Sequence, residues 1–163
     1  MGGGRQLARH ARPGPTPNVL GEATALPFGD SEFPSVALLY VLYHLDKPRL
    51  ALAEARRVLR PGGLVAVAAP SRDDSPELAE ALPDEPLTFD AELAPELLSE
   101  LFVGVEAERW DAPLLELPTR QAVRDYLVGK GVAPERAGSA AEAVDAPLSV
   151  TKRGALAFAR KPA

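Results

Sequence analysis

The chain of 163 residues contains no cysteine, one tryptophan and only two histidines. Without cysteine it can form no disulfide, no thiolate zinc site and no cysteine nucleophile. With two histidines, no Ser-His-Asp arrangement stands out among the residues. A dinucleotide-binding glycine fingerprint is missing as well, which makes a dehydrogenase a remote alternative. The sequence therefore points away from several common enzyme classes before any motif is considered.

An excess of basic charge is also missing. The 23 acidic residues outnumber the 18 basic ones, and the net charge is −5. A chain of this charge is not drawn to phosphate backbones or anionic membranes, so neither nucleic acid nor a membrane is an expected partner. No apolar run approaches the length of a membrane span, and the first residues lack the apolar stretch of a signal peptide. We therefore predict a cytoplasmic protein.

What the chain has is enough apolar material for one core. Hydrophobic residues make up 46% of the sequence, and the 17 prolines and 13 glycines are spread along it instead of forming a linker. We predict a single domain over residues 1–163, in which residues 1–18 are weakly specified and "RQLARHAR" (residues 5–12) is interpreted as the end of a basic helix. No internal repeat is visible.

Two runs are apolar on both faces, as buried parallel strands are. They are "VALLYVL" (residues 36–42) and "LVAVAA" (residues 64–69). Between them we expect a helix that Asp46 caps, that has Pro48 in its first turn and that stops at Pro61-Gly62-Gly63. Strand, helix and strand with short connections predict a parallel crossover in an α/β protein with helices on both faces of the sheet.

The remaining segments complete this α/β pattern. A short strand end is expected at residues 19–21, and the tripeptide Lys152-Arg153-Gly154 is interpreted as the tight turn of a final hairpin. Apolar spacing predicts helices, and alternation predicts strands, in the second half. The predicted helices are residues 92–102, 120–128 and 135–144, and the predicted strands are residues 103–110 and 154–161. Thr119 is the expected cap of the second helix, and residues 103–110 are expected near an edge of the sheet.

Three motifs together resemble the class I S-adenosylmethionine-dependent methyltransferases of the small-molecule type often labelled methyltransferase type 11. They are an acidic residue and alanine before "LPF", the strand exit "VLYHL", and "RVLRPGG". The resemblance is strong over residues 19–70 and loose over residues 93–161. It implies a Rossmann-like sheet, mostly parallel, with an antiparallel C-terminal pair of strands, and S-adenosylmethionine as cofactor.

The resemblance also implies residues for the cofactor site. Glu22 corresponds to the acidic residue that accepts a hydrogen bond from the adenine amine, and Ala23 to the residue whose backbone amide faces the ring. The family usually has the shorter Asp at the position of Glu22. Leu38, Leu39 and Tyr40, at the end of the fourth strand of the family, would lie beside the methionyl part of the cofactor.

The family's glycine-rich turn and the acidic residue after its second strand have no counterpart here. "MGGGRQ" follows no strand, so its glycines have no sheet to position them. The resemblance therefore implies a methyltransferase sheet without its first two strands, which would leave the strand at residues 36–42 as an exposed apolar edge. A homodimer, a partner subunit or a rearranged N-terminus would cover such an edge. A late start codon, a degenerate remnant and a functional half remain open explanations.

The substrate side is less defined. Tyr43 and His44 are candidates for lining an acceptor pocket, and no residue is named as a catalytic base, since methyl transfer needs mainly in-line positioning in a desolvated pocket. Asp73-Asp74 is interpreted as a solvated loop, and no metal site is predicted. The leading hypothesis is transfer of a methyl group to a small molecule. The alternative is a non-catalytic methyltransferase-like interaction module.

Overall fold

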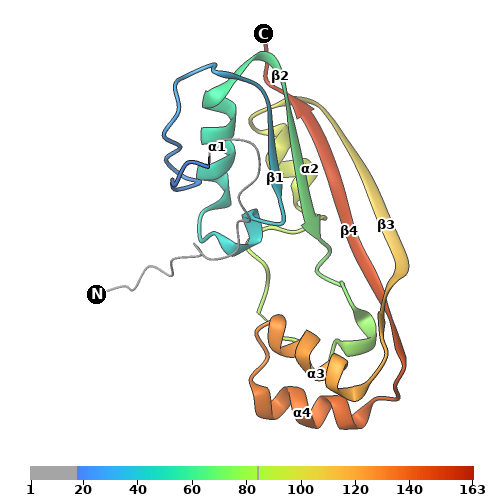
Figure 1. Ribbon diagram of the computed structural model, residues 1–163. Coiled ribbons are helices and arrows are strands. Elements are labelled where there is room, and N and C mark those ends of the chain that lie inside the picture. The colour runs from blue at the N-terminus through green and yellow to red at the C-terminus, as the bar shows by residue number, and fades with distance from the viewer. Residues whose placement is uncertain (1–17, 84) are drawn as a thin grey trace.

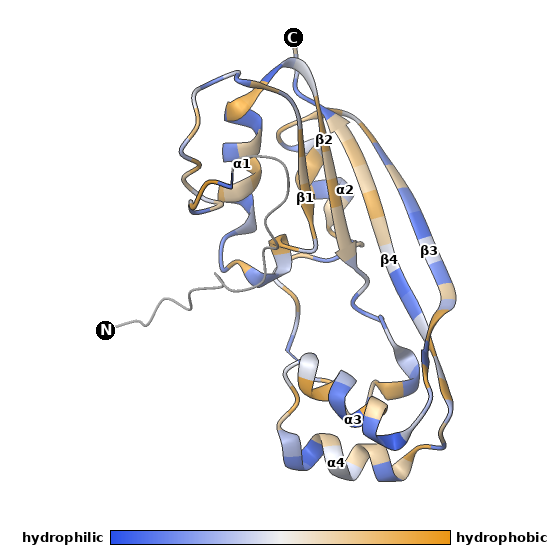
Figure 2. Ribbon diagram, viewed as in Figure 1, coloured by the Kyte–Doolittle hydropathy of each residue, from blue (hydrophilic) through white to orange (hydrophobic). Residues whose placement is uncertain are grey.

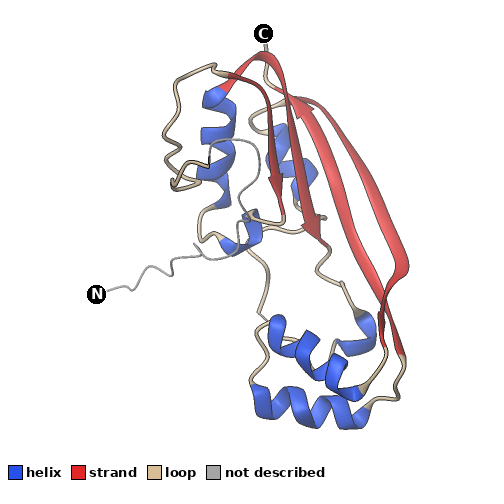
Figure 3. Ribbon diagram, viewed as in Figure 1, coloured by secondary structure: helices blue, strands red, loops and turns tan. Residues whose placement is uncertain are grey.

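The computed structural model describes residues 18–83 and 85–163, so the predicted basic helix within residues 5–12 lies outside the described part. Ten elements follow one another, and two of them are short 3-10 helices, labelled η (Figures 1 and 3). Their order is β1 (Phe33–Leu39), η1 (Leu42–His44), α1 (Pro48–Val58), β2 (Leu59–Pro70), η2 (Pro76–Leu78), α2 (Ala94–Ser99), β3 (Val103–Leu117), α3 (Arg120–Gly129), α4 (Pro134–Ala143) and β4 (Leu148–Arg160).

The four strands form one mixed sheet in the order β1-β2-β4-β3. β1 runs parallel to β2, with Val36 opposite Val65, whereas β4 is antiparallel to both β2 and β3. The predicted α/β class is confirmed. Among the described strands one pairing of three is parallel, so this part of the sheet is not mostly parallel. The predicted antiparallel C-terminal pair is present, but α3 and α4 lie between its two strands along the chain.

Helix α1 buries one apolar face, formed by Ala51, Leu52, Ala55 and Val58. Pro48 occupies the first turn, as predicted, because its missing N–H is not needed there. The predicted cap is wrong: Lys47 is the N-cap residue, and no side chain caps the helix. The helix also ends three residues before Pro61, because β2 already begins at Leu59 and includes the Pro-Gly-Gly segment.

One face of the sheet carries the main core. Val65 and Val67 of β2 are buried in one cluster with Leu52 of α1 and Leu98 of α2. The neighbouring residues on the opposite face are only partly buried or exposed: Ala37, Leu39, Leu64, Ala66, Leu156 and Phe158. Since side chains alternate along a strand, α1 and α2 cover the same face. The predicted helical cover of both faces is therefore not seen among the described residues.

The polarity of the strands changes across the sheet. Figure 2 shows β1 and β2 as largely apolar and β3 as largely hydrophilic. Among the described strands β1 and β3 are the two edges. This confirms the predicted edge position of residues 103–110. It also places the apolar strand β1 at an edge, with Leu39 56% exposed.

β3 and β4 continue beyond the end of β2 and lead to α3 and α4 (Figure 1). A second core lies there, in which Val123 and Leu127 of α3 pack with Val150 of β4 and Ala137 of α4. Thr119 caps α3, as predicted, because its hydroxyl accepts a hydrogen bond from Ala122 N at 3.1 Å. No helix within the described ranges is long and apolar enough to cross a membrane.

The predicted hairpin turn at Lys152-Arg153-Gly154 is wrong. All three residues lie inside β4, opposite Ala112, Asp111 and Trp110 of β3. The predicted strand end at residues 19–21 is not a strand either, since that segment has no regular structure and only Glu22 and Ala25 form an isolated bridge.

Candidate functional site

The carboxyl ends of β1 and β2 point toward α3 (Figure 1). Ligands of open α/β sheets bind at this end of the strands. Directly after β1, Tyr40 has a left-handed backbone with φ 54°, and its N–H donates to Ala68 O at 2.9 Å. A non-glycine residue in this region is strained, and such strain gathers at functional sites. The turn sends the chain away from the sheet and into η1.

A hollow of about 500 Å³ lies at this end of the sheet. A volume of this size accepts a small molecule. Aromatic side chains of η1, β3 and the β1 exit line it together with charged side chains of β4, α3 and the loop after β2. Its lining residues are Tyr40, Tyr43, Pro70, Asp74, Trp110, Leu114, Lys130, Lys152 and Arg153.

Gly154 allows Trp110 to form a wall of this hollow. The two residues are opposite each other on β4 and β3. A Cβ at position 154 would collide with the Trp110 indole and would lie 2.7 Å from the carbonyl oxygen of Ala69. Only glycine leaves room for the indole to lie against the strand, so Gly154 belongs to the construction of the hollow and not to a turn.

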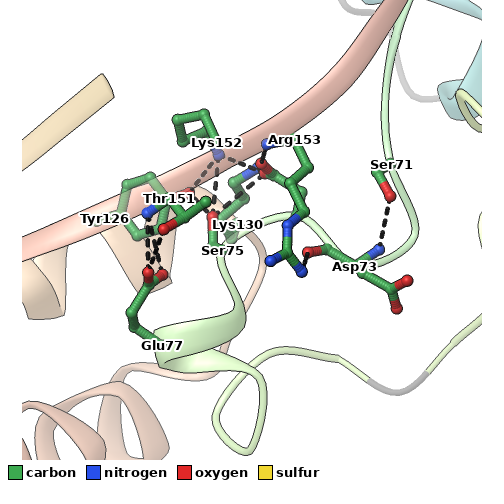
Figure 4. A network of polar contacts seen from close by, with 10 residues as sticks. Ser71, Asp73, Ser75, Glu77, Tyr126, Lys130, Thr151, Lys152 and Arg153 are labelled. Atoms are coloured by element: carbon green, nitrogen blue, oxygen red, sulfur yellow. Dashed lines mark hydrogen bonds and ion pairs between the residues drawn. The ribbon is translucent and has the colours of Figure 1, made fainter. Parts of the chain in front are cut away.

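Asp74 is the centre of a polar network that lines the hollow. Figure 4 shows its partners Lys130, Lys152 and Arg153. The Asp74 side chain is 9% exposed. The carboxylate pairs with Lys152 and with Lys130, the latter at 3.3 Å, and accepts a hydrogen bond from Arg153 N at 2.9 Å. Two ammonium groups therefore share one carboxylate.

The ammonium group of Lys152 donates hydrogen bonds to three side chains. Besides Asp74 it donates to Ser75 Oγ at 3.0 Å and to Tyr126 OH at 2.9 Å, and these two hydroxyls are 2.7 Å apart. Ser75 is fully buried. Through these contacts the network joins the loop after β2 to α3 and β4, so it holds α3 against the end of the sheet.

The network changes the acidity of its members. Burial raises the pKa of Asp74, but the hydrogen bonds from Lys152 and Arg153 N outweigh it, so the pKa is lowered overall. Burial opposes the charged form of Lys152 too, yet its bonds to Asp74 and Tyr126 raise its pKa. Burial, followed by the nearby Tyr40 and Asp74, raises the pKa of Tyr43. At neutral pH the hollow therefore holds a charged Lys152 and a neutral Tyr43 phenol.

The predicted site residues fall into two groups. Tyr40 and Tyr43 line the hollow, and His44 lines an adjoining hollow of about 530 Å³ that shares Tyr43 and Asp74. The rings of Tyr43 and His44 are 4.2 Å apart.

The other predicted residues do not line the first hollow. Glu22 and Leu39 are exposed, whereas Ala23 and Leu38 pack against the main core. The structure thus brings the predicted acceptor residues together with Tyr40, and it places the predicted adenine contacts elsewhere.

The loop that carries Glu22 is fastened to the last turns of α1. Arg57 donates to Leu26 O at 3.1 Å, to Phe28 O at 2.9 Å and to Asp30 at 2.7 Å. Glu54 accepts from Leu26 N at 2.8 Å and pairs with Arg57 at the same distance. These hydrogen bonds, with those from Arg57 first, lower the pKa of Glu54 to about 2. Arg57 comes from the "RVLRPGG" motif, so that motif holds the loop before β1.

Sequence reasoning missed the charged half of the hollow. Asp74 was expected in a solvated loop, and this is wrong, because Lys130 and Lys152 approach it from α3 and β4. Those partners are 56 and 78 residues away along the chain. The only signal was the acidic pair Asp73-Asp74 after a buried strand. Within residues 18–83 and 85–163, no group of three or more potential metal ligands is found.

The sheet order and the hollow at its carboxyl edge define an α/β fold that is also found in known methyltransferases. The YcgJ protein from Bacillus subtilis has a TM-score of 0.62 at 18% identity, over 88% of this chain and 70% of that one. An N-methyltransferase from Haemonchus contortus, solved with phosphomonomethylethanolamine and S-adenosylhomocysteine, has a TM-score of 0.51 at 15% identity, over 87% and 36% of the two chains.

The sequence comparisons find similarity to methyltransferases over part of the chain. Residues 4–67 match the model of the methyltransferase domain family, which confirms the resemblance found in the sequence. A demethylmenaquinone methyltransferase from Renibacterium salmoninarum is 46% identical over 50 residues, which are 31% of this chain and 21% of that protein. The chain therefore matches about a fifth of the length of this curated relative.

Proposed function

We propose that this chain takes part in the S-adenosylmethionine-dependent methylation of a small molecule. The observation that carries the proposal is the hollow beside Tyr40 and Tyr43, at the carboxyl ends of the two parallel strands, in a chain whose residues 4–67 match a methyltransferase domain. Binding at this end of the sheet is the general behaviour of open α/β folds.

The described residues fit the cofactor in chemical type. Glu22 offers an exposed carboxylate, which can accept a hydrogen bond from an adenine amine. Leu39 and Tyr40 are 56% and 49% exposed at the β1 exit, where an aliphatic chain would find apolar contacts. The Haemonchus contortus neighbour, whose structure includes S-adenosylhomocysteine, shares the fold and supports a cofactor of this type.

The protein's own part in the reaction is to position the acceptor and exclude water. When bound, S-adenosylmethionine supplies an electrophilic methyl group, whose transfer breaks a carbon–sulfur bond, leaves S-adenosylhomocysteine and releases the acceptor's proton to water. Trp110 and Tyr43 would hold the acceptor against the β1 exit, where in-line geometry is what the reaction needs. The neutral Tyr43 phenol can donate a hydrogen bond to it. The name of the Renibacterium salmoninarum relative supports a small organic acceptor.

A calorimetric titration with S-adenosylhomocysteine tests this function. We expect micromolar binding, which corresponds to about 8 kcal/mol, and a loss of at least about tenfold in Glu22→Ala. Glu106→Ala is the matched control, because Glu106 is also exposed but lies on β3. If the folded protein releases no heat of binding, or if both variants bind equally, the proposed cofactor site is wrong.

The alternative, a non-catalytic interaction module, is not favoured, because the sequence and structure comparisons point to methyltransferases. Two points stay predictions: the missing counterpart of the glycine-rich turn and a cytoplasmic location. Association with a second copy through the edge strand β1 is also proposed, and its test is given in the Discussion.

A further inference from the structure

The hollow is cationic in a protein that is acidic as a whole. The chain carries a net charge of −5, whereas the hollow is lined by Lys130, Lys152, Arg153 and a single carboxylate, Asp74. A concave site lined by one sign of charge concentrates ligands of the opposite sign. The local charge therefore favours an anionic ligand, although the net charge of the chain is negative.

The cationic side chains that line the hollow differ in how they are paired. The Arg153 guanidinium has its own counterion, Asp111, with Nε and Oδ1 3.1 Å apart. Lys152 and Lys130 share Asp74, so two positive charges face one negative charge. A ligand with one negative charge would provide a second counterion for these two lysines.

Lys130 is the group best placed to meet that ligand. Lys152 donates to three partners and is 24% exposed, so its ammonium group is already saturated. Lys130 lies at the end of α3, is 38% exposed and donates to one acceptor within the described residues, Asp74 at 3.3 Å. An ammonium group has three donors, so Lys130 can turn to a bound anion without leaving Asp74.

The rest of the lining is aromatic and apolar. Tyr40, Tyr43 and Trp110 come from different elements, and Pro70 and Leu114 add apolar surface. Flat side chains of this kind stack on a planar ring, and the positive edge of one ring meets the negative face of another. Arg153, the one guanidinium in this lining, has Asp111 as its counterion.

We propose that the hollow binds a planar aromatic acid with one anionic oxygen group, held by Lys130 against Tyr43 and Trp110. As the methyl acceptor, a role that rests on the proposed function, such a molecule would present its ring beside the β1 exit. The raised pKa of Tyr43 supports this, because a neutral phenol does not repel the anion.

Trp110 provides the test, since it is the only tryptophan of the chain and lines the hollow. We expect 4-hydroxybenzoate to change the tryptophan fluorescence with saturation below about 10 mM, and its neutral analogue 4-hydroxybenzamide to bind at least about fivefold more weakly. Added salt should weaken the binding of 4-hydroxybenzoate but not that of 4-hydroxybenzamide. Lys130→Gln should weaken the binding of 4-hydroxybenzoate about five- to tenfold. Lys47→Gln, which replaces an exposed lysine before α1, should leave this binding unchanged.

Equal binding of the acid and the amide, or no saturable change with either, would overturn the proposal. Circular dichroism of Lys130→Gln excludes misfolding as the cause of weaker binding. A titration with S-adenosylhomocysteine on the same sample separates the two claims: cofactor binding without probe binding rejects the aromatic acid, whereas probe binding without cofactor binding rejects methyl transfer.

Discussion

At the scale of single residues, Asp74 carries the largest share of the polar organisation at the site. Its carboxylate accepts hydrogen bonds from the ammonium groups of Lys152 and Lys130 and from the backbone N–H of Arg153. Removing one member of a buried ionic group leaves the others without their partner, which costs more than the pair contributes. Asp74 therefore links the stability of the protein to the shape of the hollow.

We expect Asp74→Asn to lower the free energy of unfolding by about 3 kcal/mol at pH 7, because Lys152 then stays partly buried without a counterion. The pKa of Asp74 is lowered in the folded protein, so its contribution is present above the pKa of the unfolded chain and is lost as the pH falls through the folded value. Urea unfolding from pH 7 to pH 3 should show this loss in the original protein and a flatter curve in the variant.

Asp46→Asn is the control for this prediction, since Asp46 is exposed and does not cap α1. Equal stability of the two variants at pH 7, or parallel pH curves for Asp74→Asn and the original protein, would show that the network adds nothing to folding.

Single residues of the site also differ in whether they could be predicted from the sequence. The position of Tyr40 and Tyr43 at the carboxyl end of β1 could be predicted, because they follow a recognisable buried strand and only the end of that strand had to be located. Asp74 could not, since its environment depends on Lys130 and Lys152, which the sheet and α3 bring close from far along the chain. A carboxylate next to a strand end looks the same in sequence whether it is solvated or buried.

At the scale of elements, the loop before β1 depends on α1. Arg57 and Glu54 bind three backbone groups of that loop, at Leu26 and Phe28. The helix thereby fixes the segment that carries Glu22. The position of the proposed adenine contact is thus set by the same helix that packs against the main core.

We expect Arg57→Gln to speed amide hydrogen exchange by more than about tenfold in residues 22–31, because this segment would then open at a lower free-energy cost. S-adenosylhomocysteine should bind more weakly for the same reason. Arg60→Gln, an exposed arginine three residues later, is the matched control. Unchanged exchange in Arg57→Gln would mean that other contacts hold the loop.

Elements could be predicted better than their ends. The helices after Lys47, Thr119 and Ala133 all exist, because apolar spacing and prolines at first turns define them locally. The end of α1 and the start of β4 could not be placed. Gly62 N donates to Lys161 O and Lys161 N to Gly63 O, so a distant strand draws the Pro-Gly-Gly segment into the sheet.

At the scale of the whole molecule, the main feature is the face of the sheet that no helix covers within residues 18–83 and 85–163. β1 is an edge strand among the described residues, and Ala37 and Leu39 are exposed on the face opposite the helices. Unpaired strand edges with apolar side chains promote pairing with another chain. The parallel crossover could be predicted from sequence, but the uncovered face could not, because the apolar pattern of β1 and β2 is that of strands covered on both sides.

We expect the protein to self-associate through β1, which light scattering after size exclusion would show as a mass of two copies. Ala37→Lys should shift it toward the monomer, because a charge on an edge strand disfavours pairing. Ala107→Lys, with an exposed alanine on the other edge strand β3, should not. A monomer at all concentrations, or an equal effect of both variants, would contradict the proposed contact.

The most direct test of the whole account is a crystal structure of the protein with S-adenosylhomocysteine. We expect adenine beside Glu22, the methionyl part along Leu38, Leu39 and Tyr40, and the sulfur facing the hollow between Tyr43 and Trp110. Cofactor bound at another part of the sheet, or with its sulfur turned away from this hollow, would contradict the proposed methyl transfer at this site.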